Sequence, residues 1–442
     1  MLKPLLKLWK KHIELKHLVD IRPFKAIRYT QKAGAPENLI SQPYDKIDAE
    51  MQKEYYHKSP YNYCRLILPM EENNYQVAQQ QVEKWLKDGV LAKESEPVIF
   101  VSRQEFALDG KKYERAGIIA ALRLYDYSEN MVFPHEFTYK APKFDRLNML
   151  RAVQKDLEPV FLIYSDPERK TLNFLKETAK TKPIIQVTDQ LQVKHTIWKV
   201  SDLQKIKQLQ ADLNEKTMVI TDGHHRYESA LAYRDEMRKK VNWTEDSAFN
   251  FHMSYMVPVQ EEGLIVLPTH RLLKKFKLTV EVLQELKRFF DISEIDPNVK
   301  ALEDFLKNHV KEHAFCIYDG AKAYGLSLKH DKNVYDFVKV NVSKETKIFD
   351  VVILRDIVFK CILKTGELNM DENILYARWT REAMEKVNRG EASLSFIVNP
   401  ISAQTVAEIA QQHELLPEKS TDFYPKMVSG LMMMDISPNE KL

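Results

Sequence analysis

The stretch that decides the fold runs Met218-Val219-Ile220-Thr221-Asp222-Gly223-His224-His225-Arg226-Tyr227-Glu228-Ser229-Ala230-Leu231. Its apolar, β-branched first half predicts a strand that stops at Asp222-Gly223. Tyr227 and Leu231 then recur at helical spacing, which predicts a helix. A strand, a tight glycine turn and a helix start direct several backbone N–H groups at one point, near the positive end of the helix dipole. The stretch therefore predicts a site for a phosphate or a carboxylate.

The side chains of this turn also fit an anion. His224, His225 and Arg226 supply two imidazoles and a forked guanidinium. Asp222 and Gly223 also have a structural interpretation, because Asp is a favoured N-cap and Gly supplies a turn. Zinc is less favoured, since neighbouring rings on a helix diverge by about 100° and no second His or Cys pair lies at helical spacing. We predict phosphate binding by all five residues and assign no metal ligand.

The stretch Thr221–Tyr227 resembles the signature of a bacterial family named domain of unknown function 1015. Other motifs of that family occur in the same order at Ile21-Arg22-Pro23-Phe24, Gln42-Pro43-Tyr44-Asp45, Pro134-His135-Glu136-Phe137-Thr138, Leu267-Pro268-Thr269-His270-Arg271 and Lys419-Ser420-Thr421-Asp422-Phe423-Tyr424-Pro425-Lys426. The turn is also similar to the phosphate-binding motif of the ParB/sulfiredoxin superfamily, which includes free-serine kinases with an Asp-Gly-His-His-Arg turn. The resemblance implies a mixed α/β chain of the α+β class, with a ParB/sulfiredoxin-like core elaborated with extra strands and a C-terminal α/β domain.

The chain of 442 residues is long for a single core, so we expect more than one domain. We predict a basic N-terminal extension over 1–20, a phosphate-binding core over 21–275 and a C-terminal α/β domain over 276–442. Apolar residues of the extension fall at helical spacing among lysines, which suits a membrane surface, a docking helix or an extension from an upstream start codon. We favour the last two, because the resemblance begins at Ile21.

Composition excludes several classes of protein. The 66 Lys and Arg residues against 63 Asp and Glu leave a formal charge of +3, which argues against a protein that coats nucleic acid. Three cysteines without a Cys-x-x-Cys pair fit a reduced cytoplasm. No apolar run approaches the roughly 20 residues that span a bilayer. We expect a soluble cytoplasmic protein; the sequence does not indicate its oligomeric state.

Periodicity predicts most of the elements around the turn. It indicates a helix over 74–88 and a hairpin of strands 97–108 and 113–127 about Asp109-Gly110. Further elements are helices near 140–155, 168–180 and 202–214, and strands near 158–165, 183–200 and 251–259. In the last part we predict helices 279–290, 301–309, 349–364 and 403–412, strands 314–319, 323–329 and 334–339, and a βαβ closure over Ile397–Met434.

Several residues outside the turn are further candidates. Tyr44 and Asp45 follow a proline that fixes φ. Asp45 is a base, a metal-binding carboxylate or a turn cap, and Tyr44 is a substrate contact. At a strand end, His135 is a candidate to bind substrate phosphate and Glu136 a candidate base; the alternative is a surface pair after a proline. Arg22 and Arg146 are second phosphate cations or ordinary ion-pair partners. The loop that ends at Lys426 either binds substrate or crosses the surface.

Together these features predict phosphoryl transfer from ATP or ADP, with Mg²⁺, to the hydroxyl of a small metabolite such as free serine. Glu136 or Asp45 takes the proton, and His225 neutralises phosphate. No Gly-x-x-x-x-Gly-Lys-[Ser/Thr] loop or Gly-x-Gly-x-x-Gly fingerprint occurs, so ordinary kinases and dehydrogenases are not indicated. Two alternatives stay open: a phosphomonoester hydrolase acting on phosphoserine, with His225 as nucleophile or acid, and a non-catalytic ParB-like nucleotide-binding protein.

Overall fold

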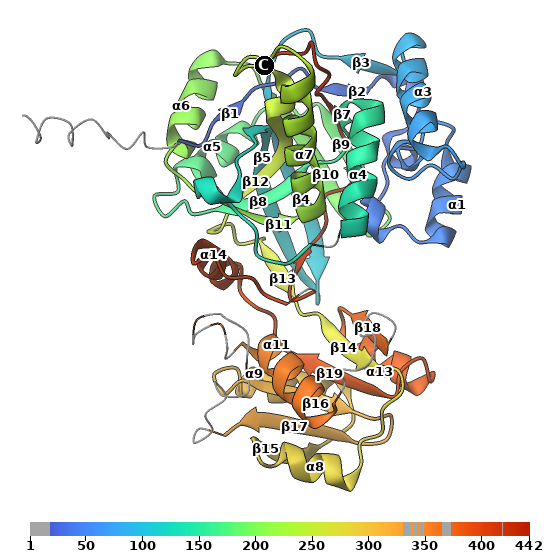
Figure 1. Cartoon of the computed structure of the whole chain (residues 1–442), viewed down its shortest axis with the longest axis vertical. Helices are drawn as coiled ribbons and strands as arrows, with labels where there is room; N and C mark the ends of the chain where they lie inside the picture. The colour runs from blue at the N-terminus through green and yellow to red at the C-terminus, as the bar shows by residue number, and fades with distance from the viewer. Residues whose placement is uncertain are drawn as a thin grey trace, which may run out of the picture. The chain divides into compact units, whose positions relative to one another are not determined.

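The computed structural model describes residues 18–442 apart from 139, 330–337, 339–342, 344–345, 347–348, 365–372 and 418. They form two compact units (Figure 1). Unit 1 extends to Pro134 and includes Thr138–Gly263 and Pro425–Leu442, and unit 2 comprises His135–Phe137 and Leu264–Tyr424. Each unit combines helices with β-sheet, so the predicted α+β class is confirmed. The predicted extension lies outside the described residues except for 18–20.

Unit 1 is built on a mixed sheet in the order β6-β11-β8-β12-β5-β4-β10-β9, with β1 also paired to β5. Strand β11, which feeds the central turn, runs parallel to β6 and antiparallel to β8. The predicted hairpin is confirmed as β4 and β5, which pair from Phe100 opposite Ile119 to Leu108 opposite Lys111. The strands are β1 (Ile21–Arg22), β4 (Ile99–Leu108), β5 (Lys111–Arg123), β6 (Val132–Phe133), β8 (Val160–Tyr164), β9 (Ile185–Thr188), β10 (Lys194–Val200), β11 (Met218–Asp222) and β12 (Phe251–Pro258).

Helices cover this sheet, and two of them lie side by side over the strands in Figure 1: α4 (Lys140–Val153) and α7 (His224–Lys240). The predicted helix 74–88 is confirmed as α3, and Gly89 ends it in the left-handed conformation (φ 70°). The remaining helices are α1 (Ala49–Lys58), α2 (Cys64–Ile67), α3 (Asn74–Lys87), α5 (Lys170–Thr178) and α6 (Leu203–Leu213). Short pairs β2–β3 (Ile27–Tyr29, Leu91–Lys93) and β7–β21 (Lys155–Asp156, Met434–Asp435) complete unit 1.

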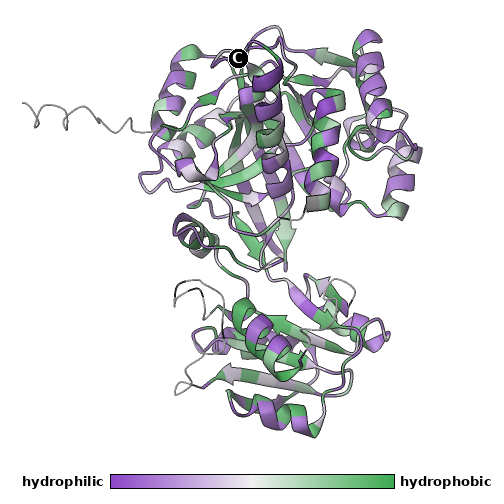
Figure 2. Ribbon diagram, in the orientation of Figure 1, coloured by the Kyte–Doolittle hydropathy of each residue, from purple (hydrophilic) through white to green (hydrophobic). Residues whose placement is uncertain are grey.

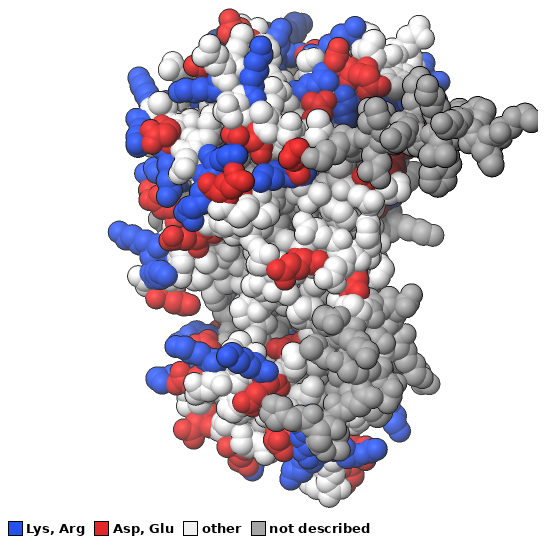
Figure 3. Space-filling model, turned by 90° about the vertical axis from the view of Figure 1, so that its left-hand side faces the viewer, with Lys and Arg blue, Asp and Glu red and all other residues white. Residues whose placement is uncertain are grey.

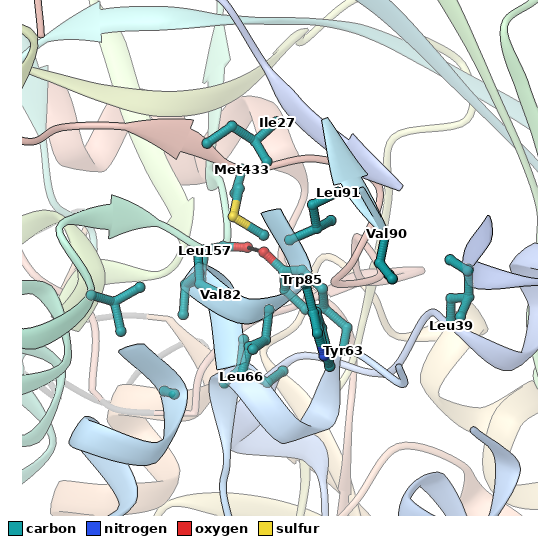
Figure 4. Packing of buried hydrophobic residues seen from close by; sticks show 14 of the residues in the cluster. Ile27, Leu39, Tyr63, Leu66, Val82, Trp85, Val90, Leu91, Leu157 and Met433 are labelled. Carbon is teal, nitrogen blue, oxygen red and sulfur yellow. Dashed lines mark hydrogen bonds between the residues drawn. The ribbon is translucent and has the colours of Figure 1, made fainter. Parts of the chain in front are cut away.

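An apolar cluster of unit 1 lies between the first helices and the short strands (Figure 4). Trp85 of α3 and Tyr63 are almost wholly buried in it, and the hydroxyl of Tyr63 donates to the carbonyl oxygen of Leu157 at 2.7 Å. Met433 packs into the same cluster from the far end of the chain. Burial of these side chains therefore ties the C-terminal residues to the N-terminal helices.

Residues 425–442, here called the C-terminal strap, belong to unit 1, whereas the sequence predicts them to close the C-terminal domain. In Figure 1 the strap is the darkest red trace and runs among unit 1 elements. Only Met434–Asp435 forms a strand, paired with β7. The largely apolar run Met427–Met432 is buried and lines a small cavity against Met253 of β12. Within it, Ser429 pairs with Ser41 in an isolated antiparallel bridge. An apolar run in the sequence predicts that a segment is buried, but it does not predict which unit the segment packs against.

The strap and α4 cover opposite faces of the sheet. Successive residues of a strand point to opposite faces, so His252 and Met253 of β12 face away from each other. His252 shares a cavity with α4, and Met253 shares one with the strap. The large sheet is thus buried on both sides, which explains why the residues of β12 and β8 are buried throughout.

Unit 2 contains an antiparallel sheet in the order β15-β17-β16-β19-β14-β18, and a separate pair, β13 (Ile265–Leu267) with β20 (Asp422–Tyr424). Every pair in the larger sheet is antiparallel, so the predicted βαβ closure is wrong for its described strands. Those strands are β14 (His270–Leu273), β15 (Phe290–Ile295), β16 (Ala314–Tyr318), β17 (Ala323–Leu328), β18 (Ile374–Ala377) and β19 (Leu394–Val398).

The helices of unit 2 largely follow the predicted periodicity. Among the described residues they are α8 (Val280–Leu286), α9 (Val299–Asn308), α11 (Asp350–Ile353), α13 (Thr380–Asn388) and α14 (Ala403–Gln411). The predicted helix 349–364 begins as α11 but continues as a π-helix over Leu354–Ile362, a form that amphipathic spacing does not distinguish from an α-helix. The predicted strand 334–339 lies outside the described residues except for Val338.

Surface chemistry is mixed. Hydrophobic residues concentrate on the strands, and α7 is mostly hydrophilic (Figure 2). On the face in Figure 3, Lys and Arg are interspersed with Asp and Glu. Within the described ranges, no helix combines the length and apolarity needed to cross a bilayer.

Candidate functional site

The central turn joins β11 to α7 through Gly223, whose φ of 88° lies in the left-handed region. A Cβ atom added at Gly223 would lie 2.9 Å from the guanidinium of Arg226. Two constraints therefore require glycine: the backbone conformation and the guanidinium packed against it. The turn opens a helix of 17 residues, whose dipole favours negative charge at its amino end.

Asp222 lies between two cations. Its Oδ2 accepts from Nη2 of Arg226 at 2.7 Å, and its Oδ1 accepts from Nζ of Lys426 at 2.6 Å. Burial acts to raise the pKa of Asp222, but the charges of Lys426 and Arg226 outweigh it and hold the pKa well below its usual range. The carboxylate stays ionised and neutralises part of both cations.

The guanidinium of Arg226 donates its hydrogen bonds mainly to other groups of the protein. The sequence predicts a guanidinium that meets an anion directly, but Nη1 donates to the carbonyl oxygen of Pro159 and Nη2 donates to Asp222. Burial acts to lower its pKa, but nearby carboxylates outweigh this effect and raise it; in order of effect they are Glu158, Asp222 and Asp45. The arginine orients the turn and is surrounded by negative charge.

Glu158 is a site residue that sequence reasoning missed. Its Oε1 accepts from the backbone N of Tyr44 at 3.2 Å and from Oγ of Ser429 at 2.6 Å. It therefore links the predicted Tyr44-Asp45 turn, the strap and Arg226. The only available signal in the sequence was a carboxylate before a proline that leads into an apolar strand. We call Asp45, Glu158, Asp222, Arg226 and Lys426 the charged cluster.

The other residues predicted to bind phosphate or substrate in the core differ in position and exposure. Tyr44 and Arg146 lie beside the charged cluster, with the guanidinium 4.1 Å from the centre of the tyrosine ring. Asp45 is exposed, whereas His224 is buried and His225 is half-buried. Arg22 instead pairs with Asp20 and Asp246, so its described contacts are ordinary ion pairs.

His135 and Glu136 lie in unit 2. His135 is fully buried, and its Nε2 lies 2.8 Å from Oγ1 of Thr421. Oε1 of Glu136 accepts from the backbone N–H groups of Ser420 and Thr421 at 3.1 and 3.3 Å. These contacts hold the loop before β20. In the structure, Glu136, which the sequence predicts as a base, therefore anchors this loop.

A small cavity of about 30 Å³ lies behind the turn. Arg226 and His252 line it together with Asp156, which is 1% exposed. Burial raises the pKa of Asp156 to about 8, and burial lowers the pKa of His252 to about 3, so both groups are neutral at pH 7. Nε of Arg226 and Oδ1 of Asp156 have no hydrogen-bond partner within the described part of the chain. The cavity has room for about one water and is too small for phosphate.

No group of three or more His, Cys, Asp or Glu side chains is arranged to hold a metal ion among the residues that the structure describes. No curated protein matches the sequence.

Several solved structures are similar to the chain at low identity. A free serine kinase variant in complex with ADP is 14% identical with a TM-score of 0.38, covering 73% of this chain and 94% of that one. A conserved hypothetical protein from Pyrococcus furiosus is 16% identical (TM-score 0.34, 71% and 95%), and SbnI with a C-terminal truncation from Staphylococcus aureus is 9% identical (TM-score 0.35, 72% and 88%).

One family model does match most of the chain, over residues 21–351. Its range includes the central turn and the Tyr44-Asp45 pair. The chain therefore belongs to the family described as "Protein of unknown function (DUF1015)".

Proposed function

We propose that unit 1 is a phosphotransferase that binds nucleotide phosphate at the turn Asp222–Arg226 and transfers a phosphoryl group to a small metabolite. The observation that carries this proposal is the pairing of Asp222 with both Arg226 and Lys426 at the amino end of α7. The two cations neutralise the carboxylate that an incoming anion would otherwise meet. The helix dipole and the adjacent imidazoles then favour phosphate.

The reaction needs a proton acceptor, and we propose Asp45. Its side chain is the exposed carboxylate of the charged cluster, whereas Oε1 of Glu136 is engaged by Ser420 and Thr421. As the bond from the acceptor oxygen to phosphorus forms, the bond from phosphorus to the bridging oxygen breaks. Asp45 takes the hydroxyl proton, and ADP leaves if the donor is ATP, or AMP if it is ADP.

We further propose ATP or ADP as donor and free serine as acceptor, which the sequence resemblance implies. Mg²⁺ supplies charge neutralisation and is commonly held by nucleotide phosphate oxygens with only one or two protein carboxylates. Because the described residues offer no cluster of three ligands, we assign no site in which the protein alone holds the ion. We expect the reaction to take place in the cytoplasm.

The test begins with thermal-shift measurements of ATP, ADP and inorganic phosphate with Mg²⁺, because a ligand selective for the native state raises apparent stability. Transfer to serine is then followed by ³¹P NMR. We expect Asp45→Asn to lower kcat by about 10²- to 10⁴-fold with nucleotide binding retained. Glu50→Gln, at another exposed carboxylate nearby in the sequence, is the control and leaves kcat unchanged.

Two outcomes would replace the proposal. Phosphate release from phosphoserine without nucleotide would identify a phosphomonoester hydrolase. Nucleotide binding without turnover of any hydroxyl acceptor would identify a binding protein. Absence of any nucleotide or phosphate effect on stability would contradict the site itself.

A further inference from the structure

A buried arginine holds the beginning of the C-terminal strap. Arg115 lies on β5 directly opposite Gln104 of β4 and is 0% exposed. Its Nε donates to Oε1 of Gln104 at 3.2 Å, and its Nη2 donates to the carbonyl oxygen of Pro425. Nε2 of Gln104 in turn donates to the carbonyl oxygen of Lys426 at 3.0 Å. Two side chains of the sheet thus bind two consecutive carbonyls of the strap.

These contacts constrain the backbone of Lys426, whose side chain reaches Asp222. Lysine has a long flexible side chain and loses conformational entropy when its ammonium group is held in one place. Holding the backbone of Lys426 reduces the freedom of the remaining stem. Its side chain is 9% exposed and its Nζ lies 2.6 Å from Asp222. The order of contacts runs from Arg115 and Gln104, through the strap backbone, to the carboxylate of the turn.

We propose that Arg115 and Gln104 are positioning residues that hold Lys426 on Asp222 and so keep the turn able to accept a phosphate. If Lys426 leaves, Asp222 presents less compensated negative charge to an incoming phosphate, which repels it. The consequence for binding rests on the proposed function, whereas the placement of Lys426 is measurable without it. The strap therefore completes a site whose other members lie before residue 230.

The test measures the accessibility of Lys426 in the full chain by reductive methylation and mass spectrometry. We expect Arg115→Met to raise the labelling rate of Lys426 about tenfold, because the strap loses the hydrogen bond from the charged Arg115 to the carbonyl oxygen of Pro425, which is worth about that factor. Gln104→Met, which removes no charge, raises it in the same direction and keeps the test valid if Arg115→Met does not fold. Arg103→Met is the matched control: its side chain points to the other face of β4 and is 26% exposed, so it leaves Lys426 labelling unchanged.

Binding of inorganic phosphate and ADP is then measured calorimetrically on the same proteins. The inference predicts about tenfold weaker binding in both positioning variants and wild-type binding in Arg103→Met. Unchanged labelling in a folded Gln104→Met overturns the placement. Raised labelling with wild-type phosphate affinity overturns its role in the site. If labelling rises but wild-type protein binds neither probe, the proposed function fails while the placement of Lys426 stands.

Discussion

Nζ of Lys426 lies 2.6 Å from Oδ1 of Asp222, although 204 residues of sequence separate them. The other carboxylate oxygen accepts from Arg226, so one partly buried carboxylate is shared by two cations. In the sequence, the strap begins only after the last segment of unit 2. The charge balance at the turn consequently includes a lysine of the strap.

Replacement of Lys426 by methionine is expected to destabilise unit 1 by about 1 to 3 kcal/mol, because it leaves a partly buried carboxylate with one partner fewer. Lys93→Met is a suitable comparison, since Lys93 is 31% exposed and its pairs with Asp435 and Glu440 are worth at most about 1 kcal/mol. Urea unfolding measures both. Equal losses would contradict a special role for Lys426.

Acid should weaken the pairing at Asp222. Its pKa is lowered in the folded state by Lys426 and Arg226 against the effect of burial, so its stabilisation is complete above the unfolded pKa of about 3.9 and is lost as pH falls toward the folded pKa. Asp222→Asn lacks this contribution. The difference in unfolding free energy between wild type and variant should therefore narrow from pH 5 to pH 3. A constant difference would show that Asp222 does not titrate with a lowered pKa.

Asp156 gives the opposite pH dependence. Burial raises its folded pKa to about 8, so the folded protein keeps a proton that the unfolded chain releases above pH of about 4. Stability should fall as pH rises to 8. His252, with its pKa lowered to about 3 by burial, opposes this trend only below its unfolded value of about 6.5. Between pH 6.5 and 8 the wild type should lose up to about 1.4 kcal/mol per pH unit relative to Asp156→Asn. Parallel urea midpoints across this window would refute the assignment.

Gly223→Ala should cost more than Gly110→Ala. Both glycines have positive φ, 88° and 76°, so both changes carry a backbone penalty of about 1 to 2 kcal/mol. A Cβ at Gly223 also meets the Arg226 guanidinium, whereas a Cβ at Gly110 has no atom within 4 Å. The excess loss at Gly223, read from thermal unfolding, reports displacement of the guanidinium. Similar losses would mean that Arg226 moves away freely.

Glu136→Gln separates an anchor from a base. We expect faster hydrogen exchange at the backbone amides of Ser420 and Thr421, since a neutral amide oxygen accepts their hydrogen bonds more weakly than a carboxylate. Phosphoryl transfer by unit 1, once measured, should keep its pH profile. If Glu136→Gln instead abolished one arm of the pH–rate profile and left the hydrogen-exchange rates of these two amides unchanged, Glu136 would be the base.

Local sequence predicted local structure well around the turn. The β-branched run, Asp222-Gly223 and the helical spacing that follows are correctly interpreted because each reports a backbone preference of adjacent residues. The Asp109-Gly110 hairpin is predicted for the same reason. The π-helix after Ile353 is missed, since apolar spacing does not record which carbonyl each N–H selects.

The sequence by itself determined the turn, its glycine and the residue types that suit an anion. Only the tertiary structure decided that Arg226 donates its hydrogen bonds to Asp222 and Pro159. It also decided that Glu158 belongs to the charged cluster and that the strap packs in unit 1. The physical reason is that periodicity encodes which face of an element is buried, whereas partners far apart along the chain are chosen by pairing, burial and charge compensation in the folded state.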